Sequence, residues 1–140
     1  MKIDRFIDEY HFLSNFYDAS VMYKGLLYKN NEAAFQSVKC ISEKDREQFT
    51  NFTASKAKSF GRHVKLRSDW EEIKDQVMYD IVKDKFTRNK DLQEKLLATD
   101  NIYLEEGNWW QDTYWGVCNG TGQNKLGKIL MQVRKELGAE

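Results

Sequence analysis

The chain contains no proline. Proline is the residue that most directly ends helices and central strands, so the helix ends and turns here must be formed by glycine, asparagine, aspartate and serine. A chain of 140 residues can form one domain that buries about two-thirds of its unfolded surface. Its hydrophobic content of 41% is typical of a globular protein. We therefore expect one domain over residues 1–140.

The charge balance excludes partners that are bound mainly through a global field. Lys plus Arg and Asp plus Glu both number 22, so any anion site must be a local patch rather than a basic face for nucleic acid or membrane. No segment approaches the ~20 apolar residues that span a bilayer. Cys40 and Cys118 lie far apart without a CxxC partner, which favours reduced thiols and a cytoplasmic protein.

Apolar spacing and capping residues predict a helix-rich α+β domain with a few short strands. A hairpin is expected at 21–28 around Lys24-Gly25, and Gly61 is expected to end a helix as a left-handed cap. Ser68, with Glu71 three residues later, forms a capping box in sequence. The other predicted elements are strands at 3–6 and 101–106 and helices at 30–41, 43–51, 53–60, 69–86, 89–97 and 124–137.

Three polar residues share one face of the helix predicted at 30–41. Glu32, Gln36 and Lys39 follow the spacing i, i+4, i+7, with apolar residues on the other side. Such a stripe is often an ordinary solvated face. Alternatively, it aligns a carboxylic acid, an amide and an amine along the wall of a cleft.

The only concentration of basic residues surrounds residues 56–67. The guanidinium group of Arg62 or Arg67 can hold a phosphate through paired N–H groups, although scattered surface cations give the same pattern. Two histidines, His11 and His63, fall outside any metal-ligand spacing, so no metal site is expected.

Aromatic residues and glycines concentrate at 109–127. Flat rings form walls, glycines admit close backbone approach and a helix start at Asn124 offers N–H groups to an anion. A small-molecule pocket and a buried aromatic wedge explain this stretch equally well. Ser14 and Asn15, inside the aromatic segment 11–17, either face a cleft or satisfy a turn.

Read in order, these segments resemble the NADAR family, whose name refers to NAD and ADP-ribose. The matching motifs are Leu13–Phe16, Glu32–Lys39, Gly61-Arg62, Asp69–Glu71, Val77-Met78, Lys85-Phe86, Asp112–Gly116, Gly122–Gly127, Leu130-Met131 and Arg134. The ordered set covers nearly the whole chain. Family members often carry a histidine after the glutamate of the second motif, where this chain has Ala33.

The resemblance implies hydrolysis of an N-glycosidic bond between a phosphorylated or ADP-linked ribose and a nitrogen base, without metal or cofactor. It assigns the attacking amine to Lys39, with Glu32 as proton shuttle and Asp112 as a second carboxylate. Further expected substrate contacts are Asn15, Gln36 and Asn124 for ribose hydroxyls, Arg62 for phosphate, Trp109 and Trp115 for the base, and Gly116 in the surrounding wall.

Two substrates are compatible with this interpretation. One is a ribosylamino-pyrimidine phosphate of the riboflavin pathway, and the other is ADP-ribose attached to guanine in a nucleotide or nucleic acid. Neutral net charge leans towards the small molecule. A non-catalytic module that binds NAD or ADP-ribose is the alternative from another class, and an interaction protein with an aromatic patch is a third; neither needs an acid and an amine on one face.

Overall fold

A computed structural model of the chain describes residues 1–139. The described chain is rich in helices with only a few short strands, which confirms the predicted fold class. It divides into two compact units, and each is described by itself. Unit 1 comprises Met1–Ser14 and the chain from Lys90 onward, and unit 2 is the intervening segment Asn15–Asn89.

Unit 2 begins with the predicted hairpin. Strands β2 (Asp18–Tyr23) and β3 (Leu26–Asn30) pair antiparallel. Lys24 (φ 50°) and Gly25 (φ 82°) both adopt left-handed backbone, as a two-residue turn of type I′ requires. Val21 and Tyr28 are opposite each other across the hairpin and almost fully buried, so this face forms part of the core of unit 2.

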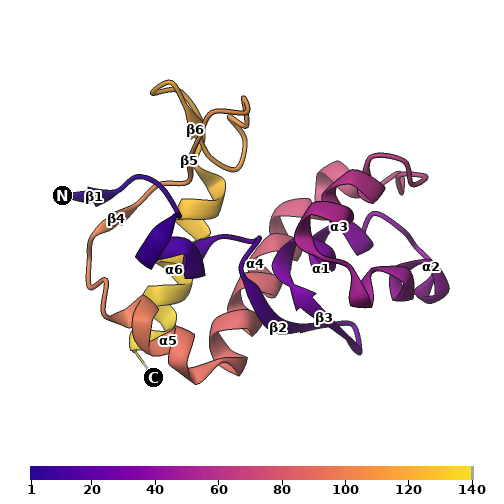
Figure 1. Ribbon diagram of the computed structural model, residues 1–140, viewed down its shortest axis with the longest axis horizontal. Helices are drawn as coiled ribbons and strands as arrows, with labels where there is room; N and C mark the ends of the chain where they lie inside the picture. Colours follow the sequence, from indigo (N-terminus) through magenta and orange to yellow (C-terminus); the bar gives the residue numbers. More distant parts are fainter. Residues whose placement is uncertain (140) are drawn as a thin grey trace. The chain divides into compact units, whose positions relative to one another are not determined.

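The helices of unit 2 pack around this hairpin. They are α1 (Asn31–Ser37), α2 (Glu43–Glu47), the 3-10 helix η2 (Gln48–Asn51), α3 (Ala54–Gly61) and α4 (Trp70–Arg88). Figure 1 shows the long helix α4 alongside β2, with α1 next to the hairpin and to α3. Met78, Ile81 and Phe86 follow helical spacing on one face of α4 and fill the interior together with Phe49 of η2.

Several local predictions in unit 2 are wrong. Helix α1 ends at Ser37 rather than near residue 41, and the helix predicted over 43–51 is a short α-helix followed by a 3-10 turn. Gly61 lies inside α3 and does not have a positive φ angle, so it is no left-handed cap. The N-cap of α4 is Asp69 rather than Ser68, without a capping hydrogen bond from its side chain. Asp69 instead pairs with Arg67, at 2.7 Å.

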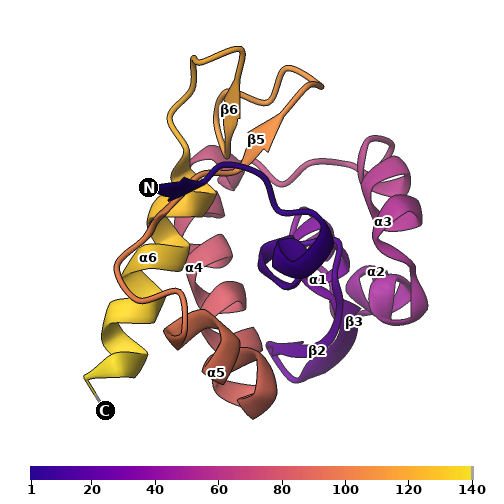
Figure 2. The same ribbon diagram turned by 60° about the vertical axis from the view of Figure 1, so that its left-hand side comes forward.

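Unit 1 combines both ends of the described chain. Its elements are β1 (Lys2–Ile3), the 3-10 helix η1 (Asp8–Leu13), α5 (Lys90–Leu97), β4 (Tyr103–Leu104), β5 (Gly107–Asn108), β6 (Val117–Cys118) and α6 (Lys125–Gly138). Strand β1 pairs parallel with β4, and β5 pairs parallel with β6. The strands predicted at 3–6 and 101–106 are thus two residues long. Figure 2 shows α6 beside α5; α6 also contacts β4, and its apolar face buries Leu126, Leu130 and Val133.

Across residues 1–139, no helix combines the length and the apolar character that crossing a bilayer requires. The same residues contain no group of three or more His, Cys, Asp or Glu side chains arranged to hold a metal ion. Both cysteines, Cys40 and Cys118, are buried free thiols.

Candidate functional site

Helix α1 is held at its start by asparagines. The Asn30 side chain accepts a hydrogen bond from the Ala33 N–H group at 2.7 Å, as an N-cap does. The Glu32 N–H group donates to the Asn15 carbonyl at 3.0 Å. These bonds satisfy N–H groups that a helix start otherwise leaves open, so this end of α1 is fixed by the protein itself.

Every residue of α1 is buried, including its polar ones. Buried polar groups are costly unless they are hydrogen-bonded, and two of the polar side chains of α1 bond to each other. Gln36 donates from Nε2 to Glu32 Oε2 at 2.7 Å, with the two side chains one helical turn apart. Glu32 and Gln36 are only 9% and 7% exposed, so the predicted polar stripe is not a solvated face.

Lys39 lies just beyond α1, in a tight turn. The N–H groups of Val38, Lys39 and Cys40 each donate to the carbonyl three residues earlier. Arg67 holds this turn from outside, because its backbone N–H donates to the Lys39 carbonyl at 3.1 Å and its Nη1 donates to the Val38 carbonyl at 3.3 Å. The end of α1 is therefore tied to the segment that precedes α4.

The surroundings of Lys39 lower the pKa of its amine. Partial burial lowers the Lys39 pKa, the Glu32 carboxylate opposes this shift, and the positive charge of Arg62 adds to it. The amine lies 6.0 Å from the centroid of the Trp70 ring. A lysine whose pKa is lowered in this way is a better nucleophile near neutral pH than one in water.

Arg62 and Arg67, the two arginines predicted as alternatives for holding a phosphate, differ in their contacts. Arg67 is engaged, because Nε and Nη2 donate to the two oxygens of Asp69 at 2.7 and 3.3 Å. This guanidinium group holds the pKa of Asp69 below its usual range. Arg62 follows α3, is exposed and acts electrostatically on Lys39. Of the two arginines, Arg62 is therefore the exposed one, whereas Arg67 is bonded to Asp69.

Asn15 is buried at the start of unit 2. Its side-chain oxygen accepts from Asn31 Nδ2 at 3.3 Å, and its Nδ2 lies 3.5 Å from Met78 Sδ. Unit 2 therefore brings together Glu32, Gln36, Lys39 and Arg62, with Asn15 attached through the backbone of Glu32. Sequence reasoning placed Trp70 in the core alone, whereas its ring also borders the Lys39 amine and tilts against Phe35 at 5.0 Å.

The other predicted site residues belong to the loops of unit 1. Asp112 Oδ1 accepts the N–H groups of Tyr114 and Trp115 at 3.1 and 2.9 Å, which folds the loop around its carboxylate. Trp109 is 83% exposed, with its ring perpendicular to that of Trp110 at 5.6 Å. The Trp115 ring packs on Tyr114 at 4.8 Å.

Gly116 is required by a neighbour that sequence reasoning missed. A Cβ at residue 116 would overlap both the carbonyl oxygen and the carboxylate oxygen Oε2 of Glu106. That carboxylate also accepts from Asn108 Nδ2 at 3.0 Å. The contact that draws attention to Glu106 is with Gly116, ten positions later, so no pattern of neighbouring residues predicts it.

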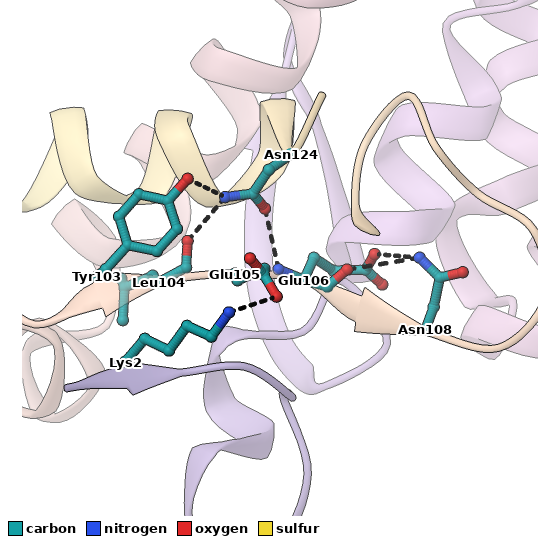
Figure 3. A network of polar contacts seen from close by, with 7 residues as sticks. All are labelled: Lys2, Tyr103, Leu104, Glu105, Glu106, Asn108 and Asn124. Carbon is teal, nitrogen blue, oxygen red and sulfur yellow. Dashed lines mark hydrogen bonds and ion pairs between the residues drawn. The ribbon is translucent and has the colours of Figure 1, made fainter. Parts of the chain in front are cut away.

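Asn124 connects the start of α6 to the segment after β4 (Figure 3). Its Nδ2 donates to the Leu104 carbonyl at 2.9 Å and to the Tyr103 hydroxyl at 3.3 Å, while its Oδ1 accepts from the Glu106 N–H at 3.0 Å. Asn124 itself has left-handed backbone, with φ at 52°. Its amide is therefore engaged on both sides within unit 1.

The glycine-rich start of α6 is likewise satisfied by the protein. The N–H groups of Lys125 and Leu126 donate to the carbonyls of Tyr114 and Trp115 at 3.2 and 2.9 Å. Two of the N–H groups that a helix start usually presents to an anion are thus already bonded.

Comparison with known proteins places this chain in a characterised group. The model of the NADAR domain family matches residues 4–138. N-glycosidase YbiA of Escherichia coli K12 is 35% identical over 137 residues, covering 95% of this chain and 85% of that protein. Riboflavin biosynthesis protein VVA0006 of Vibrio vulnificus is 37% identical over 135 residues, which cover 93% of this chain and 36% of that protein.

A solved structure supports the same relationship. The NMR structure of E. coli YbiA matches with a TM-score of 0.86 at 33% sequence identity, covering 99% of this chain and 84% of that one. The agreement extends over nearly the entire described chain.

Proposed function

Because the chain belongs to the NADAR domain family, we propose that it is an N-glycosidase, a hydrolase that cleaves the C1′–N bond between a ribose and a nitrogen base. Relatives that share about a third of its residues along most of their length carry the name N-glycosidase. One observation carries the proposal: the buried Glu32 carboxylate, bonded to Gln36, acts electrostatically on a Lys39 amine whose pKa is lowered.

The proposed reaction uses Lys39 as nucleophile and Glu32 as acid and base. Lys39 Nζ bonds to C1′ as the C1′–N bond breaks, and the leaving nitrogen takes the bond's electron pair and a proton from Glu32. Glu32, now a carboxylate, then carries a proton from Nζ to the ring oxygen as the bond between C1′ and that oxygen opens, which gives a protonated imine at C1′. Water then adds to this carbon, and the ribose product leaves as the free amine re-forms. The covalent route divides one difficult step into two easier ones.

Arg62 is proposed to bind the phosphate, since its guanidinium is exposed beside Lys39. Gln36 and Asn15 are proposed near ribose hydroxyls, and Trp109 and Trp115 against the base. Gly116 contributes to the loop wall.

Asp112 and Asn124 already form hydrogen bonds within the protein that limit their proposed roles. Asp112 Oδ1 already accepts two N–H groups, so a role as second carboxylate falls to its other oxygen. The Asn124 amide bonds Leu104 and Glu106, so binding a ribose hydroxyl would compete with these hydrogen bonds.

Borohydride trapping tests the covalent mechanism. Incubation with substrate and borohydride should reduce the imine and leave a mass adduct on a peptide that contains Lys39. Lys39→Ala should lose both the adduct and turnover, and Glu32→Gln should lose most of the turnover while remaining folded by circular dichroism. An adduct on another lysine would move the nucleophile, and full activity in Lys39→Ala would refute the covalent route.

We favour a ribosylamino-pyrimidine phosphate of the riboflavin pathway as substrate. The name of the Vibrio relative refers to riboflavin biosynthesis, and the zero net charge provides no general attraction to nucleic acid. Incubation with this compound and, separately, with ADP-ribosylated guanosine should release base faster from the former. Tight binding of ADP-ribose without turnover of either compound would instead favour a non-catalytic binding module.

We also propose a cytoplasmic location. The two buried thiols are unpaired in the fold, as is usual for proteins of reducing compartments.

A further inference from the structure

Gly61, the last residue of α3, lies directly against Gln36 of α1. A Cβ at residue 61 would overlap the amide oxygen Oε1 of Gln36 and would lie 2.8 Å from its Cδ. The φ angle of Gly61 is not positive, so its backbone conformation does not require glycine. The lack of a side chain matters here because it leaves room for the Gln36 amide.

The Gln36 amide has a defined orientation. Its nitrogen donates to Glu32 Oε2 at 2.7 Å, whereas its oxygen is buried and has no hydrogen-bond partner among residues 1–139. That oxygen faces the α-carbon of Gly61, where a weak Cα–H···O contact is available. The reversed amide would place two oxygens 2.7 Å apart and repel an ionised Glu32.

We propose that Gly61 is a positioning residue for the acid–base group of the N-glycosidase. By seating the Gln36 amide oxygen against α3, it directs the amide nitrogen onto Glu32 Oε2 and so orients the carboxyl group that exchanges a proton with substrate. This inference rests on the function proposed above and extends it to a residue outside the reacting groups.

The consequence is chemical as well as geometric. A hydrogen bond donated to a carboxylate stabilises its ionised form. Glu32 acts electrostatically on Lys39, and in the proposed reaction the two side chains together carry one proton, on the Glu32 acid, while Lys39 attacks as the free amine. Losing the Gln36 hydrogen bond makes a second proton easier to add. The acidic limb of the pH–rate profile then moves to higher pH.

A purely structural role for Gly61 predicts something else. Glycine can also serve to bring two helices close together, and α1 and α3 do pack against each other. In that case, Gly61→Ala would weaken folding and lower the amount of active protein, but the pH dependence of kcat/KM would stay unchanged.

The test compares Gly61→Ala, Gln36→Ala and the double variant, with Gly138→Ala as control. Gly138 is also a helical glycine, but its Cβ would meet Leu97 at 3.5 Å, an ordinary contact. Base release from the ribosylamino-pyrimidine phosphate and from ADP-ribosylated guanosine is measured between pH 5 and 9 in folded protein, and unfolding by urea is measured alongside.

Gly61→Ala and Gln36→Ala should each lower kcat/KM about tenfold and move the acidic limb of the pH–rate profile about one pH unit higher. These magnitudes correspond to the loss of one hydrogen bond to a charged group. The double variant should be no worse than Gln36→Ala, because removing the amide leaves the Gln36 Cβ 3.2 Å from the added methyl group. Gly138→Ala should match the parent protein.

Additive losses in the double variant, or an unmoved acidic limb in Gly61→Ala, would overturn the proposal. If Gly61→Ala does not fold, the double variant must recover folding, and its failure to do so would also overturn it. If the parent protein releases base from neither substrate, the proposed function is refuted instead. If the parent protein is active but the losses of the two single variants add in the double variant, only the role of Gly61 is refuted.

Discussion

Replacement of Lys85 by methionine should stabilise the protein in a pH-dependent way. The Lys85 side chain is 1% exposed in α4, with its amine 5.5 Å from the Tyr17 ring centroid and 5.1 Å from that of Phe86. Burial lowers its pKa from 10.5 to about 7. The unfolded chain therefore binds this proton more tightly than the folded one, and folding loses stability as pH falls from 10.5 towards 7.

The size of the effect follows from the two pKa values. One pKa unit corresponds to about 1.4 kcal/mol, so a group with these values adds about 3.5 kcal/mol to the free energy of unfolding between pH 7 and pH 10. Below pH 7 both states hold the proton and the penalty is constant. Methionine has a similar length and shape but does not titrate, so Lys85→Met removes this dependence.

Urea unfolding followed by tryptophan fluorescence at pH 7, 8, 9 and 10 measures the difference. Lys85→Met should be more stable than the parent at pH 7, and its advantage should shrink by about 3.5 kcal/mol by pH 10. Lys44→Met, at an exposed position of α2, is the control and should show no such trend. A difference that stays flat across this range would refute the reasoning, since it would mean that the fold stabilises the Lys85 ammonium.

Two further predictions concern residues with defined contacts. Asn30→Ala loses the cap to Ala33 and a hydrogen bond to the Phe52 carbonyl at 3.1 Å, and should lower the free energy of urea unfolding by about 2–4 kcal/mol; a loss below about 0.5 kcal/mol would contradict this. Gly116→Ala places a methyl group on the Glu106 carbonyl oxygen and should lower Tm more than Gly120→Ala, where only the left-handed backbone opposes alanine; equal shifts would argue against the contact.

The parts of the fold that follow from neighbouring residues were predictable from the sequence. Lys24 and Gly25 form the expected hairpin turn, Asn30 caps α1 and the apolar spacing of α6 matches its buried face. Each of these features depends on residues within a few positions, so periodicity and capping chemistry are sufficient to identify them.

The features that were mispredicted depend on distant contacts. Sequence alone took Gly61 for a helix cap, whereas its neighbour is Gln36, twenty-five positions earlier. The turn carrying Lys39 is held by Arg67, which accounts for the early end of α1, and the Arg67 guanidinium is also bonded to Asp69. Ser68 and Glu71 satisfy the capping-box pattern, but the Arg67–Asp69 pair lies at this helix start instead.

The predictable part of the candidate site is the part whose residues lie close together in the sequence. Glu32 and Gln36 share one helical face in both sequence and structure. Lys39 lies beyond the end of the helix but still interacts electrostatically with Glu32. The roles of the site residues remain predictions, and for Asp112 and Asn124 the sequence gives no indication of the backbone groups that they bind. Glu106 was missed for the same reason.

The parallel pairing of β1 with β4 has a consequence for synthesis on the ribosome. Lys2 and Ile3 are translated about a hundred residues before their partners Tyr103 and Leu104. Unit 1 therefore cannot close until most of the chain has been translated, whereas the segment with Glu32 and Lys39 is complete at Asn89. Until β4 has been translated, β1 lacks the strand with which it pairs in the folded protein.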